Sequence, residues 1–156
     1  MVNIYSDGSS RGNPGPGGFG TILRFGKHEK ELSGGFRKTT NNRMELMGVI
    51  AGLEAITKEG MDISVFTDSK YVVDPLEKGW IYGWMKKGFA KKKNSDLWMR
   101  LMRSYTKHKV KLIWIMGHAG HPENERCDQL AVEAGSGADL QIDEYYERLG
   151  ADESLF

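Results

Sequence analysis

The feature that most constrains the fold is an amphipathic helix expected at about residues 41–58. Its apolar residues recur at the three-and-four spacing that gives a helix one buried face: Leu46, Val49, Ile50, Leu53 and Ile56. Gly60 ends the pattern, and Glu45 lies at the edge of the apolar stripe, one turn into the helix. An acid near a helix start stabilises the helix by about 0.3–1 kcal/mol, so Glu45 alone indicates helix stability rather than chemistry.

The segments around this helix predict an α/β fold. We expect strands at about 2–6, 19–25, 31–36, 61–67 and 110–116. We expect further helices at about 71–78, 79–87, 96–108 and 125–133. The first three strands have short connections, which favours an antiparallel meander, and the later alternation of helices and strands favours one sheet with helices packed on its faces.

Composition and charge fit one globular domain with an acidic tail. The chain has 156 residues, 39% hydrophobic and 28% charged, and a chain near 150 residues buries about two-thirds of its unfolded surface. Residues 139–156 carry six acidic residues and a single basic one, Arg148. The net charge is therefore about +6 for the body and about −5 for the tail. We therefore expect a body over 1–138, and a tail whose apolar residues could dock on it: Leu140, Ile142, Tyr145, Tyr146, Leu149, Leu155 and Phe156.

The chain carries no feature of a membrane or secreted protein. No apolar run approaches the 18 or so residues of a membrane span, and no basic-then-apolar leader opens the sequence. Cys127 is the single cysteine, so no internal disulfide can form. We expect a cytoplasmic monomer.

Several carboxylates and glycines stand where chemistry would need them. Asp7 and Asp68 follow expected strands, and Asp128 lies on the last expected helix. The glycine- and proline-rich segment 11–18 is predicted as a turn; it lacks the Gly-Lys-Ser/Thr ending of a phosphate-binding loop. Two glycines in the first helix, at 48 and 52, indicate either a close backbone approach or simple sequence drift.

Five motifs together resemble ribonuclease H of the bacterial type 1 branch. They match in order, with similar gaps, over about residues 1–135: Asp7-Gly8-Ser9, Gly12 to Gly18, Thr39 to Leu46, Thr67-Asp68-Ser69, and Gly117 to Asp128. The resemblance implies a ribonuclease H-like fold, with a mixed five-stranded sheet of three antiparallel strands followed by parallel ones and helices on both faces.

The resemblance also implies a metal site of four catalytic carboxylates, Asp7, Glu45, Asp68 and Asp128. Four carboxylates about 5 Å apart would repel by roughly 3 kcal/mol per pair, so such a cluster needs cations. The family uses two Mg²⁺ ions with the substrate, and Mn²⁺ is also suitable for oxygen ligands. By analogy Asp7 bridges the ions, and Glu45 also faces the RNA 2′-OH.

His118 is the fifth catalytic residue that the resemblance implies, as a proton shuttle or an aid to product release. Histidine exchanges protons near neutral pH, which suits that task. The alternatives are a solvated loop histidine, or a zinc site with His121 and Cys127. The spacing of these three residues matches no usual zinc site, and Cys127 is more simply a small buried residue.

Substrate contacts are implied on two sides of an RNA–DNA hybrid. Asn13, Asn41, Asn42 and Lys70 fall where the family contacts the minor groove, although relatives often carry a glutamine in place of Lys70. Thr40 falls where the family holds a DNA phosphate, with an asparagine that is Gly83 here. A basic protrusion near 80–93 is implied for the DNA strand, with Trp80, Trp84, Lys86, Lys87, Lys91, Lys92 and Lys93.

The expected function is therefore hydrolysis of the RNA strand of RNA–DNA hybrids by two metal ions, giving 5′-phosphate and 3′-hydroxyl ends. One alternative is a non-catalytic hybrid-binding module, because a lysine run among aromatics binds nucleic acid without chemistry. Another is a DNA-cutting relative with the same fold.

Overall fold

One mixed sheet organises the computed structural model, which describes residues 1–150. Its strands follow the order β3-β2-β1-β4-β5. β1 (Val2–Ser10), β2 (Gly15–Phe25) and β3 (His28–Thr39) form an antiparallel meander, whereas β4 (Asp62–Thr67) pairs with β1, and β5 (Lys109–Trp114) with β4, in parallel. The predicted mixed sheet is thus confirmed. Four tail residues in the predictions, Asp152, Glu153, Leu155 and Phe156, lie outside the described residues.

The glycine-rich segment forms a strand earlier than predicted. β2 begins at Gly15, so the predicted turn over 11–18 shrinks to residues 11–14. A Cβ atom at Gly20 would overlap the carbonyl oxygen of Cys127, and one at Gly18 would overlap that of Ala131. These glycines extend the strand because a helix packs directly on its backbone, which a turn prediction from composition cannot anticipate.

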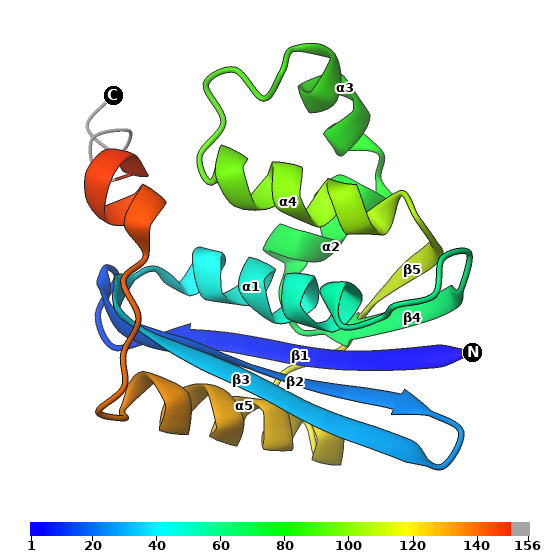
Figure 1. Ribbon diagram of the computed structural model, residues 1–156, viewed down its shortest axis with the longest axis horizontal. Coiled ribbons are helices and arrows are strands. Elements are labelled where there is room, and N and C mark those ends of the chain that lie inside the picture. The colour runs from blue at the N-terminus through cyan, green and yellow to red at the C-terminus, as the bar shows by residue number, and fades with distance from the viewer. Residues whose placement is uncertain (151–156) are drawn as a thin grey trace.

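Helices cover both faces of the sheet (Figure 1). On one face lie α1 (Asn41–Glu54), α2 (Lys70–Glu77), α3 (Trp80–Lys86) and α4 (Ser95–Tyr105), and on the other lies α5 (Pro122–Gly135). α1 stops at Glu54, four residues earlier than its apolar pattern predicts. The main core fills the space between the first group and the sheet, with Ile4, Val65, Ile50, Leu101 and Trp98 fully or almost fully buried.

The segment predicted as a protrusion, near 80–93, holds α3 and the chain that leads to α4. α3 and the chain leading to α4 project beyond the other helices, away from the sheet (Figure 1). Two buried side chains anchor it, Ile81 and Phe89, and Trp84 meets the buried Trp98 edge-on at 5.5 Å between ring centroids. Its apolar residues therefore attach the protrusion to the core and leave its lysines outside.

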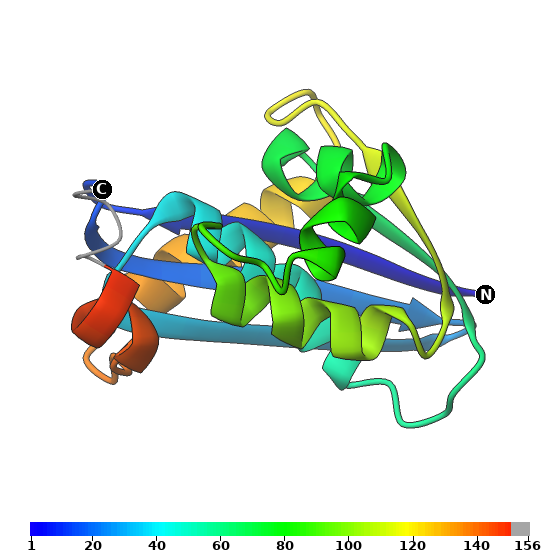
Figure 2. The same ribbon diagram turned by 90° about the horizontal axis from the view of Figure 1, so that it is seen from above.

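The tail leaves α5 and crosses the edge of the sheet to reach the helical face. Gln141 forms a parallel bridge with Phe36 of β3: its N–H donates to Gly35 O at 2.8 Å, and its carbonyl accepts from Arg37 N at 2.9 Å. A short π-helix, η1 (Tyr146–Gly150), follows beside the start of α1 (Figures 1 and 2). Within residues 1–150 no helix is long and apolar enough to span a membrane.

Candidate active site

Three carboxylates from separate elements meet at one edge of the sheet. Asp7, Glu45 and Asp68 each offer an oxygen, and these oxygens all lie within 4.8 Å of one another. The strand register explains why Asp7 and Asp68 are close. Tyr5 and Phe66 are paired on the parallel strands β1 and β4, and the two acids each lie two residues further along the chain. Glu45 comes from α1, which packs on β1 and β2.

Glycines bring α1 close enough for Glu45 to join the cluster. A Cβ atom at Gly8 would overlap the backbone of Met44 and Glu45, and one at Gly48 would lie 3.3 Å from Asp7 O. Thr21 Oγ1 also donates a 2.6 Å hydrogen bond to Gly48 O. Of the two interpretations of the helical glycines, close backbone approach is therefore confirmed.

Two acids of the cluster are buried, and Asp68 is half-buried. Asp7 is 6% and Glu45 9% exposed. Burial, followed by repulsion from Asp68 and Asp128, raises the pKa of Asp7 to about 7. Burial also raises the pKa of Glu45 well above its usual range, with Asp7 and Asp68 adding to the effect. Glu45 Oε1 is buried without a hydrogen-bond partner. All-oxygen donors with an unpaired buried oxygen fit a hard divalent cation such as Mg²⁺.

Asp128 lies at the rim of this cluster. It is half-buried on α5, which packs on β1 and β2, and it acts electrostatically on Asp7. It is not in the group of three carboxylates with oxygens within 4.8 Å. Its neighbour Cys127 is buried, with a pKa raised to about 12 by burial, and its Sγ donates to Tyr5 O at 3.3 Å. Cys127 is thus a small buried residue, packed with Ile22 and Leu130.

The loop after β5 brings His118 to the same edge. A Cβ atom at Gly117 would overlap a carboxylate oxygen of Asp68, so the loop lies directly against this acid. His118 is exposed and has a φ of 56°. Trp114 Nε1 donates to Asp68 O at 3.0 Å, and the Lys70 ammonium lies 4.6 Å from the centre of the Trp114 ring. Lys70 therefore lies over the Trp114 ring, whose indole N–H is bonded to the backbone of Asp68.

The predicted groove-facing asparagines gather at the start of α1. Asn41 N donates to Asn13 Oδ1 at 3.1 Å, and Asn41 Oδ1 accepts from Ser10 N at 2.9 Å. Asn42 is exposed beside them. Thr40 is the N-cap of α1, where its hydroxyl oxygen accepts from Arg43 N at 3.3 Å. Thr40 thus has a structural task besides any contact with nucleic acid.

The protrusion presents its lysines to solvent. Lys86, Lys87, Lys91, Lys92 and Lys93 are all exposed. The Lys92 ammonium lies 4.4 Å from the centre of the Trp84 ring, and Trp80 is 49% exposed. Five ammonium groups around an aromatic base suit a polyanion.

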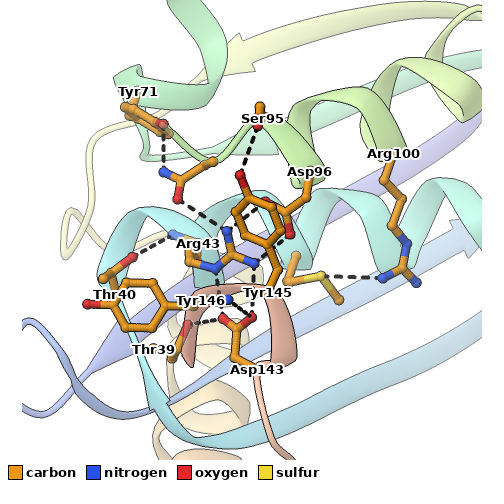
Figure 3. A network of polar contacts seen from close by, with 12 residues as sticks. Thr39, Thr40, Arg43, Tyr71, Ser95, Asp96, Arg100, Asp143, Tyr145 and Tyr146 are labelled. Carbon is orange, nitrogen blue, oxygen red and sulfur yellow. Dashed lines mark hydrogen bonds and ion pairs between the residues drawn. The ribbon is translucent and has the colours of Figure 1, made fainter. Parts of the chain in front are cut away.

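Sequence reasoning gave no role to Arg43 or Asp143, which form a buried ion pair (Figure 3). The sequence does hold a signal for the first of them. Arg43 lies three residues before Leu46 and seven before Ile50, which places it on the apolar face of α1. A charge there must find a buried partner, but nothing in the local pattern says that the partner lies in the tail.

Comparison with known proteins identifies the class as a nuclease, since the family model for RNase H matches residues 1–136. The chain belongs to the ribonuclease H family, whose members are metal-dependent hydrolases. Ribonuclease H of Desulforamulus reducens is 51% identical over 147 residues, covering 91% of this chain and 92% of that protein. Ribonuclease H of Syntrophotalea carbinolica is 55% identical over 139 residues, covering 86% and 90%.

Solved structures agree with this family and fold. LC9-RNase H1, described as a type 1 RNase H with the type 2 active-site motif, matches with a TM-score of 0.76 and 29% identity, over 97% of this chain and 83% of that one. RNase H1 of Halobacterium salinarum matches with a TM-score of 0.65 and 31% identity, over 85% and 96%. The predicted family and ribonuclease H-like fold are confirmed.

Proposed function

We propose that this chain is an endoribonuclease that hydrolyses the RNA strand of RNA–DNA hybrids and leaves 5′-phosphate and 3′-hydroxyl ends. The observation that carries the proposal is the cluster of Asp7, Glu45 and Asp68, two of them buried and one half-buried, with oxygens within 4.8 Å of one another in a chain of the ribonuclease H family. Three carboxylates at this distance repel one another, which destabilises the fold, and such clusters are typical of functional sites.

These three acids, with Asp128 at the rim, would hold two Mg²⁺ ions, or Mn²⁺ in their place. When bound, the ions supply an activated water for in-line attack on the phosphodiester and neutralise charge on the departing 3′ oxygen. Asp7 would hold an ion together with Glu45 and Asp68, because its oxygen lies within 4.8 Å of theirs. Glu45, one turn after the asparagines, would face the RNA 2′-OH as well.

The remaining residues bind the hybrid and move protons. Asn13, Asn41 and Asn42 offer amide donors and acceptors beside the cluster, and a 2′-OH is what distinguishes RNA from DNA in a minor groove. Lys70 can donate to the groove or pair with a phosphate, but it cannot accept a hydrogen bond as a glutamine would. The exposed His118 would exchange protons at the same edge.

The protrusion would hold the DNA strand. Its five exposed lysines would pair with phosphates, and one of them, Lys92, lies over the Trp84 ring. Gly83 stands where relatives carry an asparagine that helps Thr40 hold a DNA phosphate, so this difference affects only the contact with the DNA strand. Nothing lies within 4 Å of a Cβ atom built at Gly83, and Thr40 is engaged as a helix cap.

The test is a hybrid duplex labelled on either strand, incubated with and without Mg²⁺. We expect cutting confined to the RNA strand and dependent on the metal. Binding without cutting would instead indicate a hybrid-binding module, and cutting of the DNA strand would indicate a DNA-specific relative. Asp7→Asn tests the metal site: it should abolish cleavage and leave hybrid binding measurable, whereas undiminished Mg²⁺-dependent cleavage by this variant would contradict the assignment.

A further inference from the structure

The segment after α5 reaches back to the helix that carries Glu45, through one buried carboxylate. Asp143 is 7% exposed although it belongs to the acidic tail. Its Oδ2 accepts from Arg43 Nε at 2.7 Å and from Thr39 Oγ1 at 2.8 Å, and its Oδ1 accepts from Arg43 Nη2 at 2.9 Å (Figure 3). One carboxylate therefore holds residues on both sides of the N-cap Thr40.

Arg43 extends this contact to the base of the protrusion. Its guanidinium donates to both carboxylate oxygens of Asp96, at 2.8 and 2.7 Å, and to Asn94 Oδ1 at 3.3 Å. Asp96 is in the first turn of α4, and Asn94 is the residue at which the protrusion ends and α4 begins. Together with the two bonds to Asp143, these hydrogen bonds use all five N–H groups of the guanidinium.

The surroundings keep this arrangement rigid. Arg43 is 2% exposed, and Tyr145 lies over the guanidinium at 5.4 Å from its ring centroid. Burial by itself lowers the pKa of Arg43, but the hydrogen bonds to Asp96 and Asp143 outweigh it and leave the pKa above its ordinary value. A buried ion set with every donor satisfied has one low-energy geometry, since any rotation leaves a charged group unpaired.

This geometry bears on the site because of where Arg43 lies. It is two residues before Glu45 and directly after Asn42, in the first turn of α1. Fixing Thr39 and Arg43 from the same carboxylate fixes the rotation of that turn about the helix axis. Fixing Asp96 and Asn94 from the same guanidinium sets the protrusion relative to that turn. The matched family model ends at residue 136, before Asp143.

We propose that Asp143 is a positioning residue: through Thr39 and Arg43 it aligns the first turn of α1, with Glu45 and the groove-facing asparagines, against the basic protrusion. The inference rests on the proposed function, because it assumes that both surfaces hold one hybrid. Asp143 would act on the rate through orientation, because a displacement of a site residue by about 1 Å lowers the rate by up to about 100-fold.

The test compares Asp143→Asn with a matched control on the same segment, Glu147→Gln. Glu147 also ties the tail to the body, through Arg37 at 2.9 Å on β3, but Arg37 is exposed and Arg43 uses none of its hydrogen bonds on this pair. Each variant is assayed on the labelled hybrid well below its melting temperature. We expect Asp143→Asn to lower kcat at saturating hybrid and Mg²⁺ by about tenfold, and Glu147→Gln to leave kcat and KM unchanged.

A second pair of measurements separates position from stability. Asp143→Glu keeps the charge, so it should recover part of the lost kcat, and amide hydrogen exchange should rise in residues 39–46 of Asp143→Asn while the sheet stays protected. If Asp143→Asn does not fold, Thr39→Val, which removes one hydrogen bond and keeps the ion pair, takes its place with the same expected direction. Wild-type kcat in a folded Asp143→Asn or Thr39→Val would overturn the proposal. A wild-type chain that leaves the RNA strand intact would instead overturn the proposed function.

Discussion

Asp7 and Glu45 share one buried corner although they belong to a strand and a helix whose backbones touch at Gly8. Neither acid has a cationic side chain as a hydrogen-bond partner, and Glu45 Oε1 has no partner at all among the described residues. Their mutual repulsion is thus built into the backbone packing. The pair is costly to the metal-free fold, and that cost can be measured.

The first prediction is that the metal-free chain loses stability as pH rises towards neutrality. Burial raises the pKa of Asp7 from 3.8 to about 7, and that of Glu45 moves in the same direction. A carboxyl whose folded pKa exceeds its unfolded value stabilises the fold below the unfolded pKa, and this stabilisation is lost as pH rises through the folded pKa. The free energy of unfolding in EDTA should fall by about 2–4 kcal/mol between pH 4 and 7 beyond what other groups cause.

Variants of the two acids provide the control for this pH dependence. Asp7→Asn and Glu45→Gln should each flatten the decrease and raise the melting temperature in EDTA at pH 7, while Mg²⁺ should stabilise the wild type more than either variant. Chemical denaturation at several pH values, in EDTA and in Mg²⁺, measures the pH dependence and the stabilisation by the metal. Thermal denaturation in EDTA at pH 7 measures the melting temperature. Identical pH profiles in wild type and both variants would show that these acids are not strained in the metal-free fold.

The second prediction concerns Gly8→Ala. The added methyl group would overlap the backbone of Met44 and Glu45, and a helix backbone cannot give way as a flexible side chain can. We expect a loss of about 1–3 kcal/mol in unfolding free energy, as overpacking usually costs, together with a fall in kcat because α1 must move away from β1. Gly83→Ala is the matched control, since nothing lies within 4 Å of its Cβ atom and alanine favours a helix. Equal stability of the two variants would contradict the close approach.

The glycines of β2 and the Arg43–Asp143 pair show what could and could not be predicted from the sequence. Motif spacing identified the residues of the cluster through a family resemblance. The order of strands and helices favoured one sheet with an antiparallel meander, and the parallel strands after it were implied by the resemblance. The extension of β2 through its glycines was missed, because glycine in a turn and glycine under a packed helix look alike in a sequence. Arg43 and Asp143 lie 100 residues apart, and no local pattern pairs a helix arginine with one acid of an acidic tail.

The third prediction is that the protrusion determines the salt dependence of hybrid binding. Replacing Lys86, Lys87, Lys91, Lys92 and Lys93 by alanine should raise KM and reduce the slope of log affinity against log salt, by about 0.7–0.9 for each phosphate that a lysine no longer neutralises. Lys27→Ala with Lys30→Ala is the control, since both lysines are exposed on the β2–β3 hairpin, far from α3 in Figure 1. An unchanged slope in the five-lysine variant would mean that these side chains only solvate the surface.

The fourth prediction separates the chemistry of His118 from the shape of its loop. His118 has a φ of 56°, a left-handed conformation that asparagine adopts more readily than alanine does. His118→Asn therefore keeps the loop against Asp68 and removes the group that exchanges protons. We expect kcat to fall at least about tenfold with little change in KM, as the loss of a proton-transfer group requires.

His121→Asn is the matched control for His118→Asn, because it lies in the same loop as the residue before α5 and its side chain makes no capping hydrogen bond. It should leave kcat and KM within about twofold of the wild type, a difference worth less than about 0.5 kcal/mol. Equal loss in both variants would assign the effect to loop structure. Wild-type kcat in His118→Asn would make His118 a solvated loop residue. Water alone would then exchange protons at this edge.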